Sequence, residues 1–347
     1  MNIRLILFLI SGLSISISAA AQKNNAPNII LIFMDDMGNG DLSATGALEY
    51  QTPAIDKMAG EGIRFTNFLS AQAVCSASRA GLLTGCYPNR IGITGALFPN
   101  SKKGINAEET TMAELLKQKG YATSIIGKWH LGDEAPYQPN RRGFNEVFIH
   151  GAGGIGQSYA GSCGDVPKNS YYGPTILHNG KFVKTEGYCT DEFFKQATKW
   201  IEGEAAAKRP FLAWVATNAP HGPYNARPED AALYEGKGLG KDTEHFFGML
   251  HNIDQNVGKI LARLDALGIA KDTLIVFMND NGQTHGLDVF NAGMRGSKCT
   301  IWQGGSRAIS LWKWAGKWQP HTVSNLTAHL DVLPTLCDLA GAALPPP

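Results

Sequence analysis

The run Asn28-Ile-Ile-Leu-Ile-Phe-Met34 is apolar after its first residue, and the carboxylates of Asp35 and Asp36 follow it directly. Its length and its β-branched side chains predict a strand that is buried on both faces. Further apolar runs, separated by segments of helical periodicity, predict other strands at residues 121–126, 211–217, 273–278 and, more exposed, 308–314. This alternation predicts an α/β fold in which helices are layered on a sheet.

The segments between these runs contain the expected helices. Apolar residues recur at intervals of three and four over residues 242–267, and Gly268 follows as a stop signal, so the longest helix is expected there. Shorter helices are expected at residues 53–59, 110–119 and 327–339. Residues 151–189 are rich in Gly, Tyr and Ser, which predicts a long surface excursion. Long loops in compact domains are often functional.

The charge of the chain is nearly balanced. Its 347 residues include 31 Lys and Arg against 30 Asp and Glu, so the formal net charge is +1, and only 18% of the residues are charged. This composition excludes a disordered chain and a protein that binds nucleic acid through its net charge. A chain of this length also buries a large core without disulfides or metal staples.

The first residues have the pattern of an export signal. Arg4 is followed by an apolar run at residues 5–10 and by small residues up to Ala21, which predicts a secretory signal peptide at residues 1–21. Serines and a glycine dilute the apolar run, so stable membrane insertion is not expected. We therefore expect a bacterial protein that is periplasmic or secreted. In such a compartment the six cysteines could form disulfides, but the sequence does not fix their pairing. They form no CxxC pair that would indicate a zinc site.

Polar side chains follow four of the expected strands at the point where each strand ends. These are Asp35 and Asp36, then Lys128 and His130, then His221, and finally Asp280 and Asn281. In open α/β sheets ligands bind beyond the carboxyl ends of the strands. An Asp pair after a single strand is usually a turn or a helix cap, but four such coincidences predict one site.

The residue types at this edge indicate the chemistry. Asp35, Asp36, Asp280 and Asn281 offer oxygen ligands, which suit a hard cation such as Ca²⁺ or Mg²⁺ better than Zn²⁺. The cationic or protonatable groups exceed what a metal site needs, and they are Lys128, His130, His221 and Lys298. Such donors stabilise charge that develops on the oxygens of a tetrahedral anion. The pattern therefore points to transfer of a sulfuryl or phosphoryl group.

The segment around Cys75 carries the most specific pattern. Residues 74–85 read Val-Cys-Ser-Ala-Ser-Arg-Ala-Gly-Leu-Leu-Thr-Gly, which resembles the C-x-P/A-x-R signature of the type I sulfatases and its continuation to T-G. Other segments match motifs of that family in the same order: G-K-W-H-L-G at 127–132, A-P-H-G-P at 219–223, N-D-N-G at 279–282, G-S-K at 296–298 and Q-G-G-S-R at 303–307. In the last of these Gln303 stands where the family usually has Glu. The resemblance extends from about residue 28 to about residue 341.

The resemblance implies a fold and a set of ligands. The fold is a three-layer αβα sandwich with a large, mostly parallel mixed sheet, as in alkaline phosphatase and the sulfatases. Cys75 is converted to Cα-formylglycine by a formylglycine-generating maturation enzyme, and one Ca²⁺ ion is bound per chain. The implied metal ligands are Asp35, Asp36, Asp280, Asn281 and the modified Cys75.

The resemblance also implies roles for the remaining residues. Arg79 and Lys128 orient the formylglycine hydrate, one hydroxyl of which attacks the sulfur atom. The alcohol leaves with a proton from His221 or Lys298. His130 then takes the proton of the second hydroxyl, and sulfate is expelled as the aldehyde re-forms.

The expected substrate is a sulfated sugar or an aryl sulfate, with a fragment of a sulfated polysaccharide favoured. Five residues of the 151–189 excursion are candidates for stacking on a sugar ring, namely Tyr159, Tyr171, Tyr172, His178 and Tyr188. His285 is a further candidate substrate contact. Two alternatives stay open: a related metal-dependent phosphatase or phosphodiesterase, and an inactive protein that binds sulfated glycans.

The expected domain organisation is a signal peptide at residues 1–21 and one large catalytic domain at residues 22–347. Members of the family usually continue into a small C-terminal subdomain with an antiparallel sheet. The sequence stops after the last expected helix, at 327–339, so this subdomain is expected to be absent or truncated.

Overall fold

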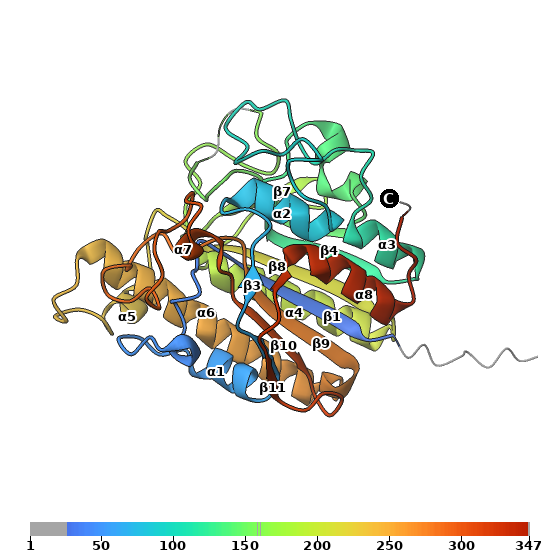
Figure 1. Cartoon of the computed structure of the whole chain (residues 1–347). Helices are drawn as coiled ribbons and strands as arrows, with labels where there is room; N and C mark the ends of the chain where they lie inside the picture. The colour runs from blue at the N-terminus through green and yellow to red at the C-terminus, as the bar shows by residue number, and fades with distance from the viewer. Residues whose placement is uncertain (1–25, 158, 160, 346–347) are drawn as a thin grey trace, which may run out of the picture.

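Strand β1 lies at the centre of one large sheet (Figure 1). The computed structural model describes residues 26–157, 159 and 161–345, so the predicted signal peptide lies outside the described residues. Within these residues ten strands form the sheet in the order β11-β2-β10-β9-β1-β8-β4-β5-β6-β7. Their bounds are β1 Asn28–Asp35, β2 Ile63–Phe65, β4 Ala122–Lys128, β5 Glu146–His150, β6 Thr175–His178, β7 Lys181–Lys184, β8 Phe211–Pro220, β9 Thr273–Asn279, β10 Ser310–Trp314 and β11 His321–Val323.

The middle of the sheet is parallel and its flanks are mixed. β1 pairs in parallel with β8 on one side and with β9 on the other, and β4 pairs in parallel with both β8 and β5. β10 is antiparallel to β9 and β2, and the β6–β7 hairpin is antiparallel and adds to β5. Two further short strands, β3 (Phe68–Leu69) and β12 (Thr327–Ala328), pair separately.

Helices cover both faces of the sheet (Figure 1). Alternate residues of β1 point to opposite faces: Ile30 and Ile32 pack with α1, α4 and α6, and Ile29 and Leu31 pack with α2, α3 and α8. The helices are α1 Pro53–Gly60, α2 Cys75–Thr84, α3 Met112–Gln118, α4 Cys189–Ala206, α5 Pro228–Ala231, α6 Lys241–Ala266, α7 Gln303–Ser306 and α8 Val332–Ala340. The expected three-layer αβα fold is therefore confirmed.

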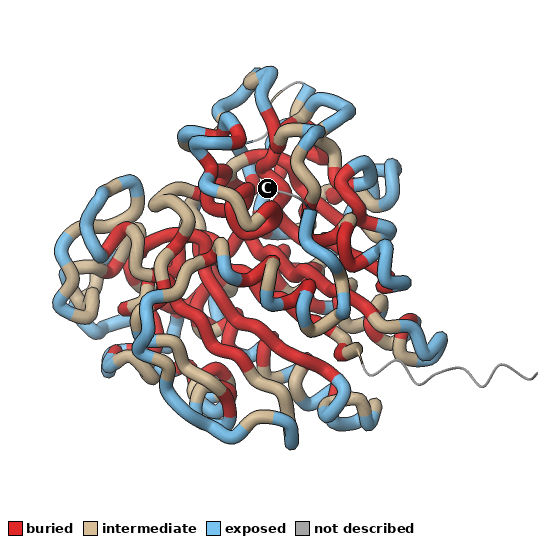
Figure 2. Tube along the Cα trace, turned by 45° about the vertical axis from the view of Figure 1, so that its right-hand side comes forward, coloured by how far each residue is buried: buried red, intermediate tan, exposed pale blue. Residues whose placement is uncertain are grey.

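The central strands are buried on both faces, and Figure 2 shows them as a continuous buried band inside exposed loops. This burial explains why their sequences are nearly unbroken apolar runs. The strands expected at 28–34, 121–126, 211–217 and 273–278 are confirmed, each within one to three residues at its ends.

Near the C-terminal end one expectation is confirmed and one is wrong. β10 is more exposed than the central strands, because Ser310, Leu311 and Trp312 are buried between β9 and β2 but Lys313 and Trp314 are only partly buried. The last helix does not begin at residue 327: Thr327 pairs with Phe68 in the β12–β3 ladder, a 3₁₀ turn follows at His329–Asp331, and only then does α8 begin.

The 151–189 excursion is more ordered than expected, because it contains the β6–β7 hairpin. Tyr171 and Tyr188 are 1% and 4% exposed and stack on each other with ring centroids 5.6 Å apart. The Tyr171 hydroxyl donates to the backbone oxygens of Asn218 and His221. These two rings belong to the core and cannot stack on a sugar, so that expectation is wrong for them.

All six cysteines lie in the described part of the chain, and all are free thiols. In that part of the chain no helix has both the length and the apolar character needed to cross a bilayer.

Candidate functional site

The carboxyl ends of β1, β8, β4 and β9 meet at one edge of the sheet. Asp35 is the last residue of β1 and pairs in register with Pro220, the residue before His221. Asn279 ends β9 beside Met34, so Asp280 follows next to Asp35 and Asp36. The four sequence segments that we expected to form one site do meet there.

Gly127 allows β4 to pass close to β8 at this edge. Its φ is +119°, and a Cβ atom at this position would lie 2.0 Å from the backbone oxygen of Ala216. Any other residue would push the strands apart immediately before Lys128. This explains the glycine in the G-K-W-H-L-G segment.

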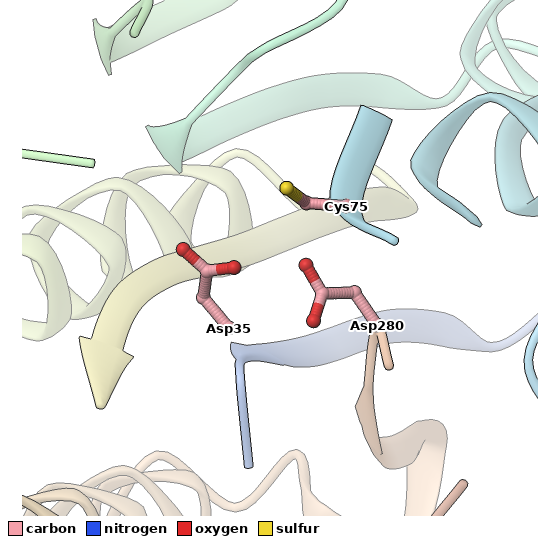
Figure 3. A group of neighbouring side chains, drawn as sticks. All are labelled: Asp35, Cys75 and Asp280. Carbon is pink, nitrogen blue, oxygen red and sulfur yellow. The ribbon is translucent and has the colours of Figure 1, made fainter. Parts of the chain in front are cut away.

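Cys75 is the first residue of α2, and its helix places it above the strand ends. Its thiol and the carboxylates of Asp35 and Asp280 offer ligand atoms that all lie within 4.8 Å of one another. Figure 3 shows the three side chains gathered at the end of β1 and the start of α2. Cys75 is 3% exposed, and burial raises the pKa of its thiol, despite the nearby ammonium groups of Lys128 and Lys298.

Three cations pair with the three carboxylates of the site. Lys128 Nζ lies 2.6 Å from Asp35 Oδ2, and Lys298 Nζ lies 2.6 Å from Asp36 Oδ1. Arg79, one turn after Cys75 on α2, places its Nη2 3.1 Å from Asp280 Oδ2. These groups are almost fully buried, so the charges are balanced locally rather than by solvent.

The carboxylates differ in their pKa values. Burial alone would raise the pKa of Asp35, but Lys128, His221 and Arg79 hold it below its usual value. Burial and the neighbouring charge of Asp35 raise the pKa of Asp280. Two carboxylates this close share a site most readily when a cation lies between them.

Two buried oxygens have the chemistry of ligands for a hard cation. Asp35 Oδ1 and Asn281 Oδ1 have no hydrogen-bond partner among the described residues, although both side chains are fully buried. The Asn281 amide Nδ2 donates to Asp36 Oδ1 at 2.9 Å. This bond fixes the amide so that Asn281 Oδ1 points elsewhere and stays available as an acceptor. An unsatisfied buried oxygen is costly, and oxygen ligands are those that Ca²⁺ and Mg²⁺ take. The residues present fit such an ion.

The two histidines of the site have defined tautomers. His130 Nε2 lies 2.8 Å from the backbone oxygen of Leu97, which only accepts, so Nε2 carries the hydrogen. Its Nδ1 has no partner in the described structure, and burial together with Lys128 lowers the pKa of His130 well below its usual value. His221 Nδ1 donates to Gly222 O at 2.7 Å, and its Nε2 faces Asp36 Oδ2 at 3.6 Å.

Cys75, His130, His221 and Lys298 open into one pocket of about 250 Å³. Apart from Tyr159, the rest of its lining was not predicted from the sequence. Residues 96–99 form one wall, fixed because Leu97 N donates to Ser76 Oγ at 3.0 Å and Leu97 O accepts from His130. Gln157 and Tyr159 form another part. No local pattern marks residues 96–99, because only their backbone makes these contacts.

Tyr159 is the one member of the aromatic set from the excursion that lines the pocket. His285 does not line it, and instead packs against the ring of Tyr224, 4.7 Å between centroids. The expectation that His285 contacts substrate therefore has no support from its position.

A family model described as Sulfatase matches residues 27–342. The chain belongs to the sulfatase family. Arylsulfatase G from Mus musculus is 34% identical over 365 residues, which cover 92% of this chain and 66% of the mouse protein. N-acetylgalactosamine-6-sulfatase from Canis lupus familiaris is 34% identical over 94% of this chain and 64% of its own length.

Sulfatases of known structure share the fold. The crystal structure of Ps i-CgsB in complex with k-i-k-neocarrahexaose superposes with a TM-score of 0.84 at 31% identity, covering 92% of this chain and 73% of that one. The chain thus spans about two thirds of the length of the curated sulfatases that it matches.

Proposed function

We propose that the protein hydrolyses sulfate esters, with sulfated oligosaccharides or polysaccharides as substrates. One observation carries the proposal: a buried cysteine and two carboxylates lie within 4.8 Å of one another, beside a pocket that His130, His221 and Lys298 line. The relatives support the substrate class, since one is a named N-acetylgalactosamine-6-sulfatase and another was crystallised with a neocarrahexaose.

Cys75 is the proposed precursor of the nucleophile. Burial raises the pKa of its thiol, so the unmodified side chain is held as a neutral thiol, which is a weak nucleophile. Conversion to Cα-formylglycine by a maturation enzyme would supply a hydrated aldehyde, whose hydroxyl attacks sulfur in this family. Arg79 and Lys128, which pair with Asp280 and Asp35, are proposed to orient the hydrate.

A single Ca²⁺ ion is the proposed metal, held by Asp35, Asp36, Asp280 and Asn281 together with modified Cys75. The free oxygens of Asp35 and Asn281 are the observation that supports it. When bound, the ion supplies positive charge against the oxygens of the sulfate group.

The hydrogen bonds of His130 assign its role. Because Nε2–H is committed to Leu97 O, Nδ1 is the basic atom, and the lowered pKa keeps it free to accept a proton near neutral pH. His130 is therefore the proposed base that takes the proton of the second hydroxyl.

His221 is the proposed acid for the leaving alcohol. Burial opposes the charge of Lys298, but Asp36 raises its pKa above the usual value, so Lys298 gives up a proton poorly. We assign to Lys298 the stabilisation of negative charge on the sulfate oxygens. His221 Nε2 faces Asp36 Oδ2 at 3.6 Å, and because Nδ1–H is bonded to Gly222 O, Nε2 is the atom that holds the transferable proton in the imidazolium form.

The remaining proposals concern the cell. A signal peptide at residues 1–21 and one catalytic domain over residues 22–347 fit an exported protein, periplasmic or secreted. The partners proposed are the sulfated substrate and the maturation enzyme.

The test combines chemistry at Cys75 with substrate choice. Peptide mass spectrometry across Cys75 measures its conversion, and sulfate release is measured from an aryl sulfate and a panel of sulfated oligosaccharides, with and without a calcium chelator. We expect Cys75→Ala to lower kcat/KM by at least about 10³-fold. Cys86→Ala, the same change at a half-buried cysteine that does not line the pocket, leaves it within about twofold.

Two results would overturn the proposal. Faster hydrolysis of the matching aryl phosphate than of the aryl sulfate would indicate a phosphatase. Unmodified Cys75 and no sulfate release, with retained binding of sulfated glycans, would indicate a binding protein.

A further inference from the structure

His329 is a fully buried histidine outside the pocket that the proposed chemistry does not use. It begins the 3₁₀ turn before α8. Its ring lies between the rings of Phe33 and Phe68, with centroids 5.5 and 5.6 Å away. An apolar side chain of the same size would fill this space, so the polar atoms of the ring need an explanation.

Both ring nitrogens make hydrogen bonds, and their donors fix the tautomer. Ala71 N–H donates to His329 Nδ1 at 3.2 Å, so Nδ1 is an acceptor, and the Ser78 hydroxyl lies 2.9 Å from the same atom. Nε2 therefore carries the hydrogen and donates to the backbone oxygen of Asn279 at 2.9 Å. The ring is neutral and fully bonded.

These partners belong to two of the segments that build the site, α2 with the residues that lead into it and the end of β9. Ser78 lies on α2, three residues after Cys75 and next to Arg79, and Ala71 lies in the segment that leads into this helix. Asn279 ends β9 and directly precedes Asp280 and Asn281. One ring thus joins the nucleophile helix to the strand end that carries metal ligands.

The Asn279 side chain extends the connection. Its Nδ2 donates to the backbone oxygens of Met37 and Asn281, at 2.5 and 2.7 Å, and its Oδ1 accepts from Ile309 N. Met37 follows Asp35 and Asp36 in the loop after β1. Through Asn279 the ring of His329 is therefore linked to both segments that supply carboxylates.

We propose that His329 is a positioning residue that sets the separation between Cys75 and the Asp280–Asn281 pair. The inference rests on the proposed function where activity is measured. The position of α2 relative to the end of β9 does not depend on that function. Groups that orient metal ligands from behind usually contribute 10- to 100-fold in metal affinity or activity, so we expect changes of about that size.

Two amide substitutions test separately the hydrogen bonds of Nδ1 to the α2 side and the hydrogen bond of Nε2 to Asn279. In His329→Asn the amide oxygen takes the place of Nδ1 and keeps an acceptor for Ala71 and Ser78. In His329→Gln the amide nitrogen takes the place of Nε2 and keeps a donor to Asn279. His329→Ala removes both. We expect kcat to fall by about 10- to 100-fold in His329→Ala with KM within about twofold, and by less in each amide variant.

Ser78→Ala provides a milder variant that removes only one hydroxyl. It should lower kcat in the wild-type background but have no further effect in His329→Gln, where its acceptor is already lost. This coupling is measurable even if His329→Ala fails to fold. The matched control is His245→Asn on α6, because His245 Nδ1 also accepts a backbone N–H, from Ala226 at 3.1 Å, far from these elements in the chain.

The readouts are kcat and KM for an aryl sulfate, normalised to the converted fraction of Cys75, and the calcium affinity from the calcium dependence of the melting temperature. Weaker calcium binding and lower kcat at unchanged KM support the positioning role. Variants with wild-type kcat and calcium affinity that only melt earlier would overturn it and leave His329 as a core residue. If wild-type protein releases no sulfate, the proposed function fails, and the calcium affinities alone decide about His329.

Discussion

The four central strands and the β6–β7 hairpin belong to one sheet but differ in what surrounds them. β1, β4, β8 and β9 are buried on both faces, and the site residues follow their ends. β7 is exposed along its whole length, and Phe182 keeps 53% of its surface in solvent. The site depends on the part of the sheet where helices press from both sides, because only there is the position of a strand end fixed by packing.

The largest contrast is expected at two lysines with equally short ion pairs. Lys128 lies 2.6 Å from Asp35 with both side chains fully buried, whereas Lys313 on β10 lies 2.6 Å from Glu61, which is 46% exposed. Lys128→Met removes the closest cation from the buried Asp35 carboxylate, which keeps only the longer pair with Arg79 Nη2, 3.7 Å from Oδ1. We expect it to cost about 3–5 kcal/mol of unfolding free energy in calcium-free buffer and about 10²- to 10³-fold in kcat.

Lys313→Met is the control, and it should cost no more than about 1 kcal/mol. Urea unfolding and sulfate-release kinetics measure both variants. Equal losses at the two lysines would show that distance rather than burial decides the contribution of these pairs.

A second contrast compares two phenylalanines. Phe277 on β9 is fully buried and Phe182 on β7 is half exposed. Phe277→Ala removes a core ring and should lower the unfolding free energy by about 3–5 kcal/mol. Phe182→Ala should change it by about 0.5 kcal/mol or less. A cost at Phe182 close to that at Phe277 would mean that the hairpin is as tightly packed as the centre.

The smallest contrast concerns pH. Burial lowers the pKa of His329 to about 4, so its contribution to stability is complete above 6.5 and is lost as the pH falls toward 4. In the 151–189 segment, burial raises the pKa of Asp165 from 3.8 to about 6. The contribution of Asp165 to the unfolding free energy is therefore complete below 3.8 and is lost as the pH rises toward 6. Each effect amounts to roughly 3 kcal/mol at its limit.

The pH dependence of the unfolding free energy between pH 4 and 7 separates the two groups. His329→Gln should make the slope less positive, and Asp165→Asn should make it more positive. Slopes that both variants leave unchanged would contradict these shifts.

The elements that could be predicted from the sequence are the strands that are buried on both faces. The runs at 28–34 and 273–278 are apolar because helices cover both faces of the sheet. Since these strands are parallel, the polar residues that follow them meet at one edge. The same reasoning failed for β6, β7 and β12, which are short and whose residues carry no periodic pattern. It also failed for Tyr171, whose hydroxyl is satisfied by backbone oxygens 47 and 50 residues away.

The residues proposed for the candidate site lie together, as the sequence predicted, but the residues that support them were not predicted. Cys75, Arg79, Lys128 and Lys298 do lie together around the carboxylates. Leu97 and His329 could not be predicted, because their contacts join segments that are far apart in sequence and leave no local pattern.

The burial of Cys75 has a consequence for its proposed conversion to Cα-formylglycine. The residue is 3% exposed, and the residues after it in α2 are buried to the end of the helix. Under the proposed conversion, a maturation enzyme would have to reach this buried side chain, and the packed helix covers it. The conversion would therefore compete with folding in time, and a chain that folds first would keep the thiol. Slower folding of the segment around α2 would then raise the yield of converted protein.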